Sequence, residues 1–336
     1  MKKINFGIIG TGIMANIYAK ILQQNAECVL LCVVGNTKER TMKFSKKFNI
    51  KFFYNSNYEE MFKFFPEIDA VIITTPEWIR LEPVKIAVKY NKHILLEKPF
   101  TKSIEDADTL YKLLNNYNKS FEICHVLRHS PRFYSLKKSI ENGDIGEIRH
   151  IYARRNSNNI RVKRVLGKTD LAFWLTPHDI DIMRWLTNSE VSEVYAVSRN
   201  KLLSHDDYLT ANLKFKNNVN AVLQISWCNP PLSGSAREAT FEIWGTKGYI
   251  ELEDFNMNIK VFSENKEVKT YDTYEDFEIN GIHHGIFENL ITYFVERVNK
   301  KSVNNISLND AYASTIACEM VSKSIKEEKI INIEKL

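Results

Sequence analysis

Cysteine is scarce in this sequence, and its positions do not fit a disulfide framework or a metal site. The 336 residues contain five cysteines, an odd number at wide spacing, which is typical of reduced thiols. Cys28 and Cys32 lie four residues apart in an apolar run that indicates a strand, where four residues span roughly 13 Å. That separation is too large for a shared metal ion, so we expect small buried residues and no metal site.

Long hydrophobic runs are absent as well. No apolar stretch approaches the roughly 18 residues of a membrane span. The first residues, MKKINFGIIG, lack the apolar core and small-residue cleavage site of a signal peptide. We therefore expect a cytoplasmic protein without a membrane partner.

The net charge is small for a chain of this length. The formal net charge is +5, and lysine and arginine are scattered along the whole sequence, so we expect no nucleic-acid partner. The length predicts about two domains, and a hydrophobic content of 44% is sufficient for a sizeable core.

The first third of the chain alternates short apolar runs with segments of helical periodicity. The expected later strands and helices are 27–34, 37–48, 69–76, 81–90, 93–97, 103–117 and 120–126. This order predicts a parallel sheet covered by helices on both faces. After about residue 123 the runs become longer and more strictly alternating, which predicts an open, mostly antiparallel sheet with helices near 131–142, 177–187, 284–299 and 307–328.

A turn that contains two glycines lies between the first apolar run and the first helix. Gly10, Gly12 and Ala15 form the pattern GxGxxA, in which the first glycine permits a tight turn and the second admits a pyrophosphate close to the backbone. The helix that starts at Ile13 and Met14 offers N–H donors and a partial positive charge. In this strand–turn–helix context we predict a dinucleotide site, and the alternative is a plain packing turn.

The end of the second strand bears on the choice between NAD and NADP. Sites that prefer NAD usually carry an acidic residue here, but none lies between Glu27 and Glu39. Polar and basic residues occupy the positions instead: Asn36, Thr37, Lys38 and Arg40. The first two suit either ribose form and the two cations suit a 2′-phosphate, so we expect NAD or NADP with a lean towards NADP.

Lys98 follows the expected strand 93–97, in the stretch ILLEKPF. Ligands of open α/β sheets bind outside the carboxyl ends of the strands, so this position allows Lys98 to reach a bound cofactor. The alternative is a surface lysine whose stem packs at the strand end.

The segment TPHDIDIMRW predicts a helix with a second candidate site. Thr176 is the expected N-cap, and Asp179 three residues later would complete a capping box. His178 and Asp181 share one face of the helix. The helix dipole disfavours a charged imidazole in the first turn, which suits a general base, and the alternative is a structural histidine.

A basic run precedes this helix. It consists of Arg154, Arg155, Arg161, Lys163 and Arg164. Such a run is usually a solvated strand edge and loop. The alternative is a site for an anionic substrate such as a nucleotide-sugar diphosphate, with Arg155 as the candidate ligand.

Taken together, several stretches resemble the glucose–fructose oxidoreductase/inositol dehydrogenase (Gfo/Idh/MocA) family. They occur in the family's order over nearly the whole chain: FGIIGTGIMA, TTPEW, HILLEKPFTKSIEDADTL, NGDIGEI, PHDIDIMRW, GTKGYIELE and NDAYASTIACEMVSKSIKEEK. The EKP triplet and the HDID helix are the specific parts. The resemblance implies an α/β N-terminal Rossmann domain at 1–123 and an α+β C-terminal domain at 124–336 with a large open, mostly antiparallel sheet.

The resemblance also implies an activity and a set of site residues. The activity is NAD(P)-dependent dehydrogenation of a secondary alcohol in a sugar, cyclitol or sugar derivative. Lys98 and His178 match the catalytic residues, and Asp181 matches a substrate-binding carboxylate. Trp174 stands where many members carry Asp, four residues before the histidine, and offers a ring that stacks on a sugar. Further cofactor contacts are implied at Thr75, Pro76 and Glu97, and the bond between Lys98 and Pro99 is expected to be cis.

The sequence also predicts an oligomer and leaves three alternative functions open. The resemblance implies a homodimer or homotetramer formed through the C-terminal sheet, with the last helix packed back on the Rossmann domain. The alternatives are a nucleotide-sugar dehydrogenase, a redox-neutral glycosidase that oxidises its substrate transiently on tightly bound NAD, and a non-catalytic cofactor-sensing regulator.

Overall fold

The chain divides into two compact units. A computed structural model describes residues 3–158, 168–200, 205–229, 237–253, 259–261, 269–271, 274–300 and 306–334. The first unit is Met1–His129 with Tyr274–Tyr312, and the second is Ser130–Thr273 with Ala313–Leu336. The expected boundary near residue 123 lies close to the first break, but the units are not contiguous segments, because residues 274–312 pack with the N-terminal sheet.

The first unit contains the parallel sheet that the alternating pattern predicts. Its order is β3-β2-β1-β4-β5-β6 and every pairing is parallel. The strands are β1 Ile4–Ile9, β2 Cys28–Val34, β3 Lys51–Phe53, β4 Ala70–Ile73, β5 His93–Leu96 and β6 Phe121–Ile123. The connecting helices are α1 Ile13–Gln24, α2 Lys38–Phe48, α3 Tyr58–Phe64, α4 Leu81–Lys89 and α5 Ile104–Leu114, with short 3₁₀ turns at η1 Glu77–Ile79 and η2 Val126–His129.

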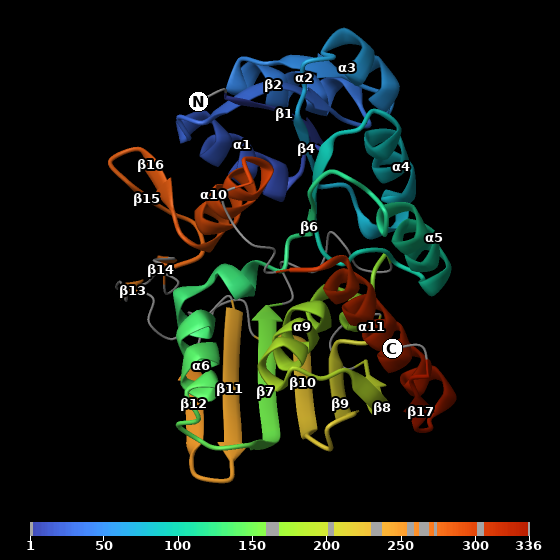
Figure 1. Cartoon of the computed structure of the whole chain (residues 1–336), viewed down its shortest axis with the longest axis vertical. Helices are drawn as coiled ribbons and strands as arrows, with labels where there is room; N and C mark the ends of the chain where they lie inside the picture. The colour runs from blue at the N-terminus through green and yellow to red at the C-terminus, as the bar shows by residue number, and fades with distance from the viewer. Residues whose placement is uncertain are drawn as a thin grey trace. The chain divides into compact units, whose positions relative to one another are not determined.

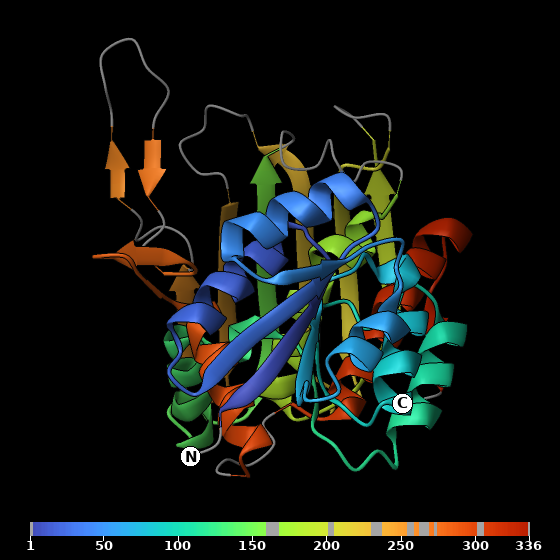
Figure 2. The same ribbon diagram turned by 90° about the horizontal axis from the view of Figure 1, so that it is seen from above.

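Both faces of this sheet are covered, because alternate strand residues bury their side chains on opposite sides. On one side Ile9 and Leu96 join a core cluster with Met61 of α3, Val84 of α4 and Leu110 of α5. The strands of this sheet run side by side from blue to cyan in Figure 2.

The other face carries a helix from the C-terminal part of the chain. Phe294 of α10 (Ile286–Val298) packs on Phe6 of β1, with ring centroids 6.3 Å apart. Figure 1 shows α10 beside α1, although the two lie far apart in the sequence. The hairpin of β15 (Phe277–Ile279) and β16 (Ile282–His284) is tied to α1, since Gln24 donates to the His283 carbonyl over 2.6 Å. No short-range pattern predicts this partnership.

The second unit is built on a seven-stranded sheet of order β12-β11-β7-β10-β9-β8-β17. Only the pair of β10 and β7 is parallel, which confirms the prediction of a mostly antiparallel sheet. The strands are β7 Ile148–Asn158, β8 Val191–Arg199, β9 Tyr208–Phe215, β10 Asn220–Asn229, β11 Arg237–Gly245, β12 Tyr249–Glu253 and β17 Ile331–Asn332. A separate pair is formed by β13 Ile259–Val261 and β14 Lys269–Tyr271.

Helices cover one face of the seven-stranded sheet. They are α6 Pro131–Glu141, α8 Leu171–Trp174, α9 Thr176–Thr187 and, beyond its first turn, α11 Leu308–Glu327. Along β8 the side chains alternate, so that Ala196 is buried under the helices and Tyr195 and Val197 are exposed. The N–H of Ala196 donates to the hydroxyl of Ser324. The other face therefore keeps aromatic and apolar side chains in solvent.

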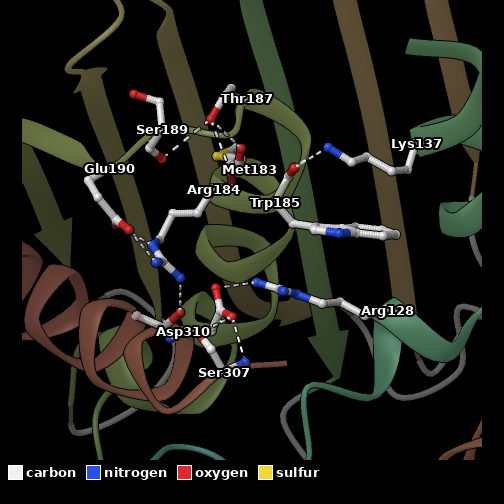
Figure 3. A network of polar contacts seen from close by, with 11 residues as sticks. Arg128, Lys137, Met183, Arg184, Trp185, Thr187, Ser189, Glu190, Ser307 and Asp310 are labelled. Carbon is white, nitrogen blue, oxygen red and sulfur yellow. Dashed lines mark hydrogen bonds and ion pairs between the residues drawn. The ribbon is translucent and has the colours of Figure 1, made fainter. Parts of the chain in front are cut away.

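Two helices of the described ranges begin with a serine cap. Ser103 accepts from the N–H of Asp106 at the start of α5. Ser307 accepts from the N–H of Asp310 at the start of α11, and Arg128 pairs with the Asp310 carboxylate at 2.9 Å (Figure 3). Within the first unit, Tyr312 of α11 donates to Asp108 of α5 over 2.6 Å, so the beginning of this helix packs on the N-terminal domain. Among the helices of the described ranges, none has the length and hydrophobicity that a membrane-spanning segment requires.

Candidate functional site

The glycine turn of the first unit has the geometry that a dinucleotide site requires. Gly10 has φ +115°, and a Cβ at this position would lie 2.3 Å from Thr74 Oγ1 and 3.2 Å from the Thr74 carbonyl carbon. Only glycine therefore fits between β1 and the end of β4. Gly12 is the N-cap of α1, and a Cβ there would meet nothing within 4 Å.

The first turn of α1 suits an anionic group. Among the described residues, no side chain caps this helix and its first turn carries no acidic residue. Gly12 and Ile13 are both exposed, so the N-terminus of this helix lies at the surface. The turn from Gly10 to Met14 thus fits a pyrophosphate held by N–H donors and by the helix dipole.

The end of β2 is open and basic. Gly35 is buried against Thr41, whereas the next residues are all exposed: Asn36, Thr37, Lys38, Glu39 and Arg40. The Lys38 ammonium lies 5.7 Å from the ring centroid of Tyr54, which belongs to the neighbouring loop after β3. A cation and an aromatic face therefore border the position where an adenosine ribose would bind.

Two of the expected cofactor contacts follow β4. Thr75 is 6% exposed, and its Oγ1 has no hydrogen-bond partner within the part of the chain that the structure describes. Such a buried hydroxyl is costly unless a ligand or water satisfies it. Thr75 thus fits a cofactor contact, and Pro76 follows it as the N-cap of the short turn η1.

Lys98 lies two residues beyond β5, at the same edge of the sheet as Gly10 and Thr75, and it is half-buried. The bond between Lys98 and Pro99 is cis, as the resemblance predicted. The preceding residue, Glu97, is buried, and its carboxylate accepts a 2.6 Å hydrogen bond from the hydroxyl of Tyr18 in α1.

Arg80 anchors the Lys98 turn, although no sequence pattern assigned it a function. It is 3% exposed and donates to three main-chain carbonyls, those of Thr75, Glu97 and Lys98. Burial lowers the pKa of the Arg80 guanidinium to about 10, and the nearby Glu97 and Glu77 carboxylates oppose this change. The guanidinium is therefore charged at neutral pH. Short-range patterns do not reveal it, because its contacts lie up to 18 residues away.

The second unit contains the other candidate residues, on α8 and α9. His178 is the third residue of α9 and is half-buried; Asp181 follows one turn later and is 1% exposed. Trp174 ends α8 and is also half-buried. The end of α9 is held separately, because Arg184 forms two 2.6 Å hydrogen bonds with Glu190 (Figure 3).

The predicted capping box at the start of α9 is wrong. Helix α8 leads into α9 after a single residue, so Leu175 is the N-cap, and the Thr176 hydroxyl donates to the Leu171 carbonyl over 3.1 Å. Asp179 is fully buried, and its carboxylate is taken by Arg155 of β7, with Nε at 2.9 Å from both oxygens and Nη2 at 2.7 Å from one. A partner from a distant strand thus replaces the local cap.

Arg155 was the candidate for an anionic substrate, but the structure places its guanidinium on Asp179, where it is 6% exposed. This contact fixes α9 against the sheet, so we do not propose Arg155 as a substrate ligand. Arg154, on the other face of β7, pairs with Glu238 at 2.8 Å. Arg161, Lys163 and Arg164 lie outside the described residues.

Two family models match this chain and together cover most of it. The model described as an oxidoreductase family with an NAD-binding Rossmann fold matches residues 4–125. The model described as the GFO/IDH/MocA C-terminal domain matches residues 133–251.

Similar proteins include dehydrogenases and a hydratase. The chain is 22% identical to myo-inositol 2-dehydrogenase of Thermotoga maritima, with 99% of both chains covered. It is 25% identical to 2,7-anhydro-N-acetylneuraminate hydratase of Mediterraneibacter gnavus, with 85% of this chain and 77% of the relative covered. A similar solved structure is scyllo-inositol dehydrogenase of Lactobacillus casei with NAD(H) and scyllo-inositol bound, at a TM-score of 0.81, 20% identity and coverage of 98% and 99%.

Proposed function

Since the chain belongs to the GFO/IDH/MocA family of oxidoreductases, we propose that it is an NAD(P)-dependent dehydrogenase of a secondary alcohol in a sugar or cyclitol. One observation carries this proposal. The glycine turn, the buried Thr75 hydroxyl and Lys98 all lie at the carboxyl edge of one parallel sheet. The inositol dehydrogenases among the relatives support a polyol substrate.

The residues of the first unit would hold the cofactor. The turn from Gly10 to Met14 would bind the pyrophosphate. The Thr75 hydroxyl would form a hydrogen bond with the nicotinamide half of the cofactor. When bound, the nicotinamide supplies a hydride acceptor or donor.

The chain's own residues would handle the proton and the developing charge. His178 would take the proton of the hydroxyl that is oxidised, as a general base. The Lys98 ammonium would stabilise the alkoxide by charge and by a hydrogen bond. Asp181 would accept a hydrogen bond from a neighbouring hydroxyl, and Trp174 would offer its ring to the apolar face of the sugar.

A substrate panel tests this proposal. Purified protein is incubated with myo-inositol, scyllo-inositol, hexoses, anhydro sugars and nucleotide sugars, each with NAD⁺ and with NADP⁺. We expect a rise in absorbance at 340 nm with at least one uncharged polyol, and no rise with its deoxy analogue at the reacting carbon. Absence of turnover across the panel, together with absence of cofactor binding, would contradict the proposal.

We also propose that NADP is the preferred cofactor. Lys38 and Arg40 lie in the first turn of α2, just beyond β2, and no acidic residue lies between Glu27 and Glu39. We expect NADPH to bind about tenfold more tightly than NADH, as one charge-assisted phosphate contact provides. Fluorescence titration measures both dissociation constants. In the Lys38→Gln variant the dissociation constant of NADPH should rise, while that of NADH should not change. A lower dissociation constant for NADH than for NADPH in the wild type would refute the preference.

A redox-neutral reaction is a second candidate, and the hydratase relatives in two organisms favour it. In such a reaction the substrate is oxidised and later reduced on one bound cofactor, so no net NADH accumulates. Its mark would be a cofactor that survives purification, together with substrate conversion that leaves the absorbance at 340 nm unchanged.

Assembly into a dimer or tetramer through the C-terminal sheet stays a prediction. The face of that sheet away from its helices exposes several aromatic and apolar side chains, which is typical of an interaction surface. They are Tyr195, Val197, Tyr208, Trp244 and Tyr249.

A further inference from the structure

The side chain of Arg80 connects the chain segments that follow two neighbouring strands, β4 and β5. Its Nε donates to the Thr75 carbonyl after β4 over 3.1 Å, and its Nη2 donates to the Lys98 carbonyl after β5 over 2.9 Å. Its Nη1 donates to the Glu97 carbonyl between them. A single buried side chain therefore satisfies three carbonyls that the parallel ladder leaves behind at its carboxyl edge.

The chemistry of these contacts requires a guanidinium. Its N–H donors point in fixed, planar directions, so it can reach carbonyls from two strands at once. A lysine at the same place would present one nitrogen on a flexible stem and could not span them. The carboxylates of Glu97 and Glu77 lie close enough to favour the charged form, so the cation is compensated where it is buried.

The same cluster reaches the glycine turn. Tyr18 belongs to α1, the helix that Gly12 caps, and its hydroxyl donates to the Glu97 carboxylate. Glu97 in turn precedes Lys98 and gives its carbonyl to Arg80. The cofactor helix and the lysine turn are thus joined by two adjacent hydrogen bonds on one residue.

We propose that Arg80 is a positioning residue that holds the main chain of Lys98 in the orientation needed for catalysis. This inference rests on the proposed role of Lys98. The guanidinium would act on the main chain alone, not on the substrate or the cofactor. It fixes the carbonyls on either side of the Lys98 N–H, and thereby limits the directions in which the Lys98 side chain leaves the turn.

The test is a double-mutant cycle of Arg80 and Lys98, run with the polyol of highest kcat/KM in the panel. We expect Arg80→Met and Arg80→Lys each to lower kcat about 100-fold, because a displacement of about 1 Å is sufficient for such a loss. The KM and the NADPH dissociation constant should change less than about threefold. In the Lys98→Met background, Arg80→Met should cause no further loss, since the residue acts only through Lys98.

A matched control separates positioning from general stability. Arg297 is also a largely buried arginine of the first unit, paired with Glu122 at 3.2 Å on β6 and lying near His93 at the opposite end of β5. We expect Arg297→Met to lower the melting temperature without lowering kcat. If Arg80→Met does not fold, Arg80→Lys decides, because it keeps the charge and most of the volume.

Each outcome of the cycle has a defined meaning. If Arg80→Lys keeps wild-type kcat, or if the losses from Arg80→Met and Lys98→Met multiply, the positioning role is refuted while the dehydrogenase proposal stands. If Lys98→Met keeps its activity, the proposed function itself is refuted. This result differs from a failure of the positioning role, because it is measured without any change at Arg80.

Discussion

Replacing Lys98 with Met is expected to lower kcat by about 10³-fold or more, the largest loss that any single change at the candidate site should cause. Methionine keeps much of the stem and its packing at the end of β5 but removes the ammonium. The alkoxide that forms as the hydroxyl loses its proton would then have no positive partner. Initial rates at 340 nm measure the loss, and fluorescence titration should give an NADPH dissociation constant close to that of the wild type.

Lys89 provides the control for this substitution. It lies on the exposed side of α4 and pairs with Glu59 in solvent, so Lys89→Met removes a lysine of the same unit far from the carboxyl edge of the sheet. Its kcat should be unchanged. Retained turnover in Lys98→Met would overturn the assignment of the lysine.

The second large effect is expected in stability, for Arg155→Met. This change leaves the Asp179 carboxylate buried without its guanidinium, which costs about 3–5 kcal/mol. The midpoint of urea unfolding should fall accordingly. The double variant Arg155→Met/Asp179→Leu should recover most of the loss, because an apolar pair of similar volume leaves no uncompensated charge.

Arg154 offers a matched control one residue away. It lies on the other face of β7, and both it and Glu238 are partly exposed. Since exposed ion pairs contribute little, Arg154→Met should cost less than about 1 kcal/mol. Equal midpoints for Arg154→Met and Arg155→Met would show that the buried pair does not hold α9 in place.

Local patterns predicted much of this protein because their physical causes are local. Gly10 must be glycine because its backbone has positive φ against Thr74, and the pattern GxGxxA signals that requirement directly. The strand before Lys98 was evident from its apolar run, and its place at the sheet's carboxyl edge follows from parallel connectivity.

The errors came where a local pattern competed with a distant partner. The segment TPHD has the residues of a capping box, yet Arg155 of β7 pairs with Asp179, and the Thr176 hydroxyl donates to the carbonyl of Leu171, the first residue of α8. Arg155 was proposed as an anion ligand because it lies in a basic run, and such a run does not reveal which of its cations is buried against a carboxylate.

The sequence alone determined the order of elements, the glycine cradle, the lysine at the end of β5 and the membership of an oxidoreductase family. These depend on residues close together in the chain, or on motifs whose order survives in it. Only the tertiary structure decided that α10 joins the N-terminal sheet, that Arg155 belongs to Asp179, and that Arg80 holds the main chain of Lys98. Each of these is a contact between distant segments, whose free energy depends on burial and on donor geometry that no spacing along the chain records.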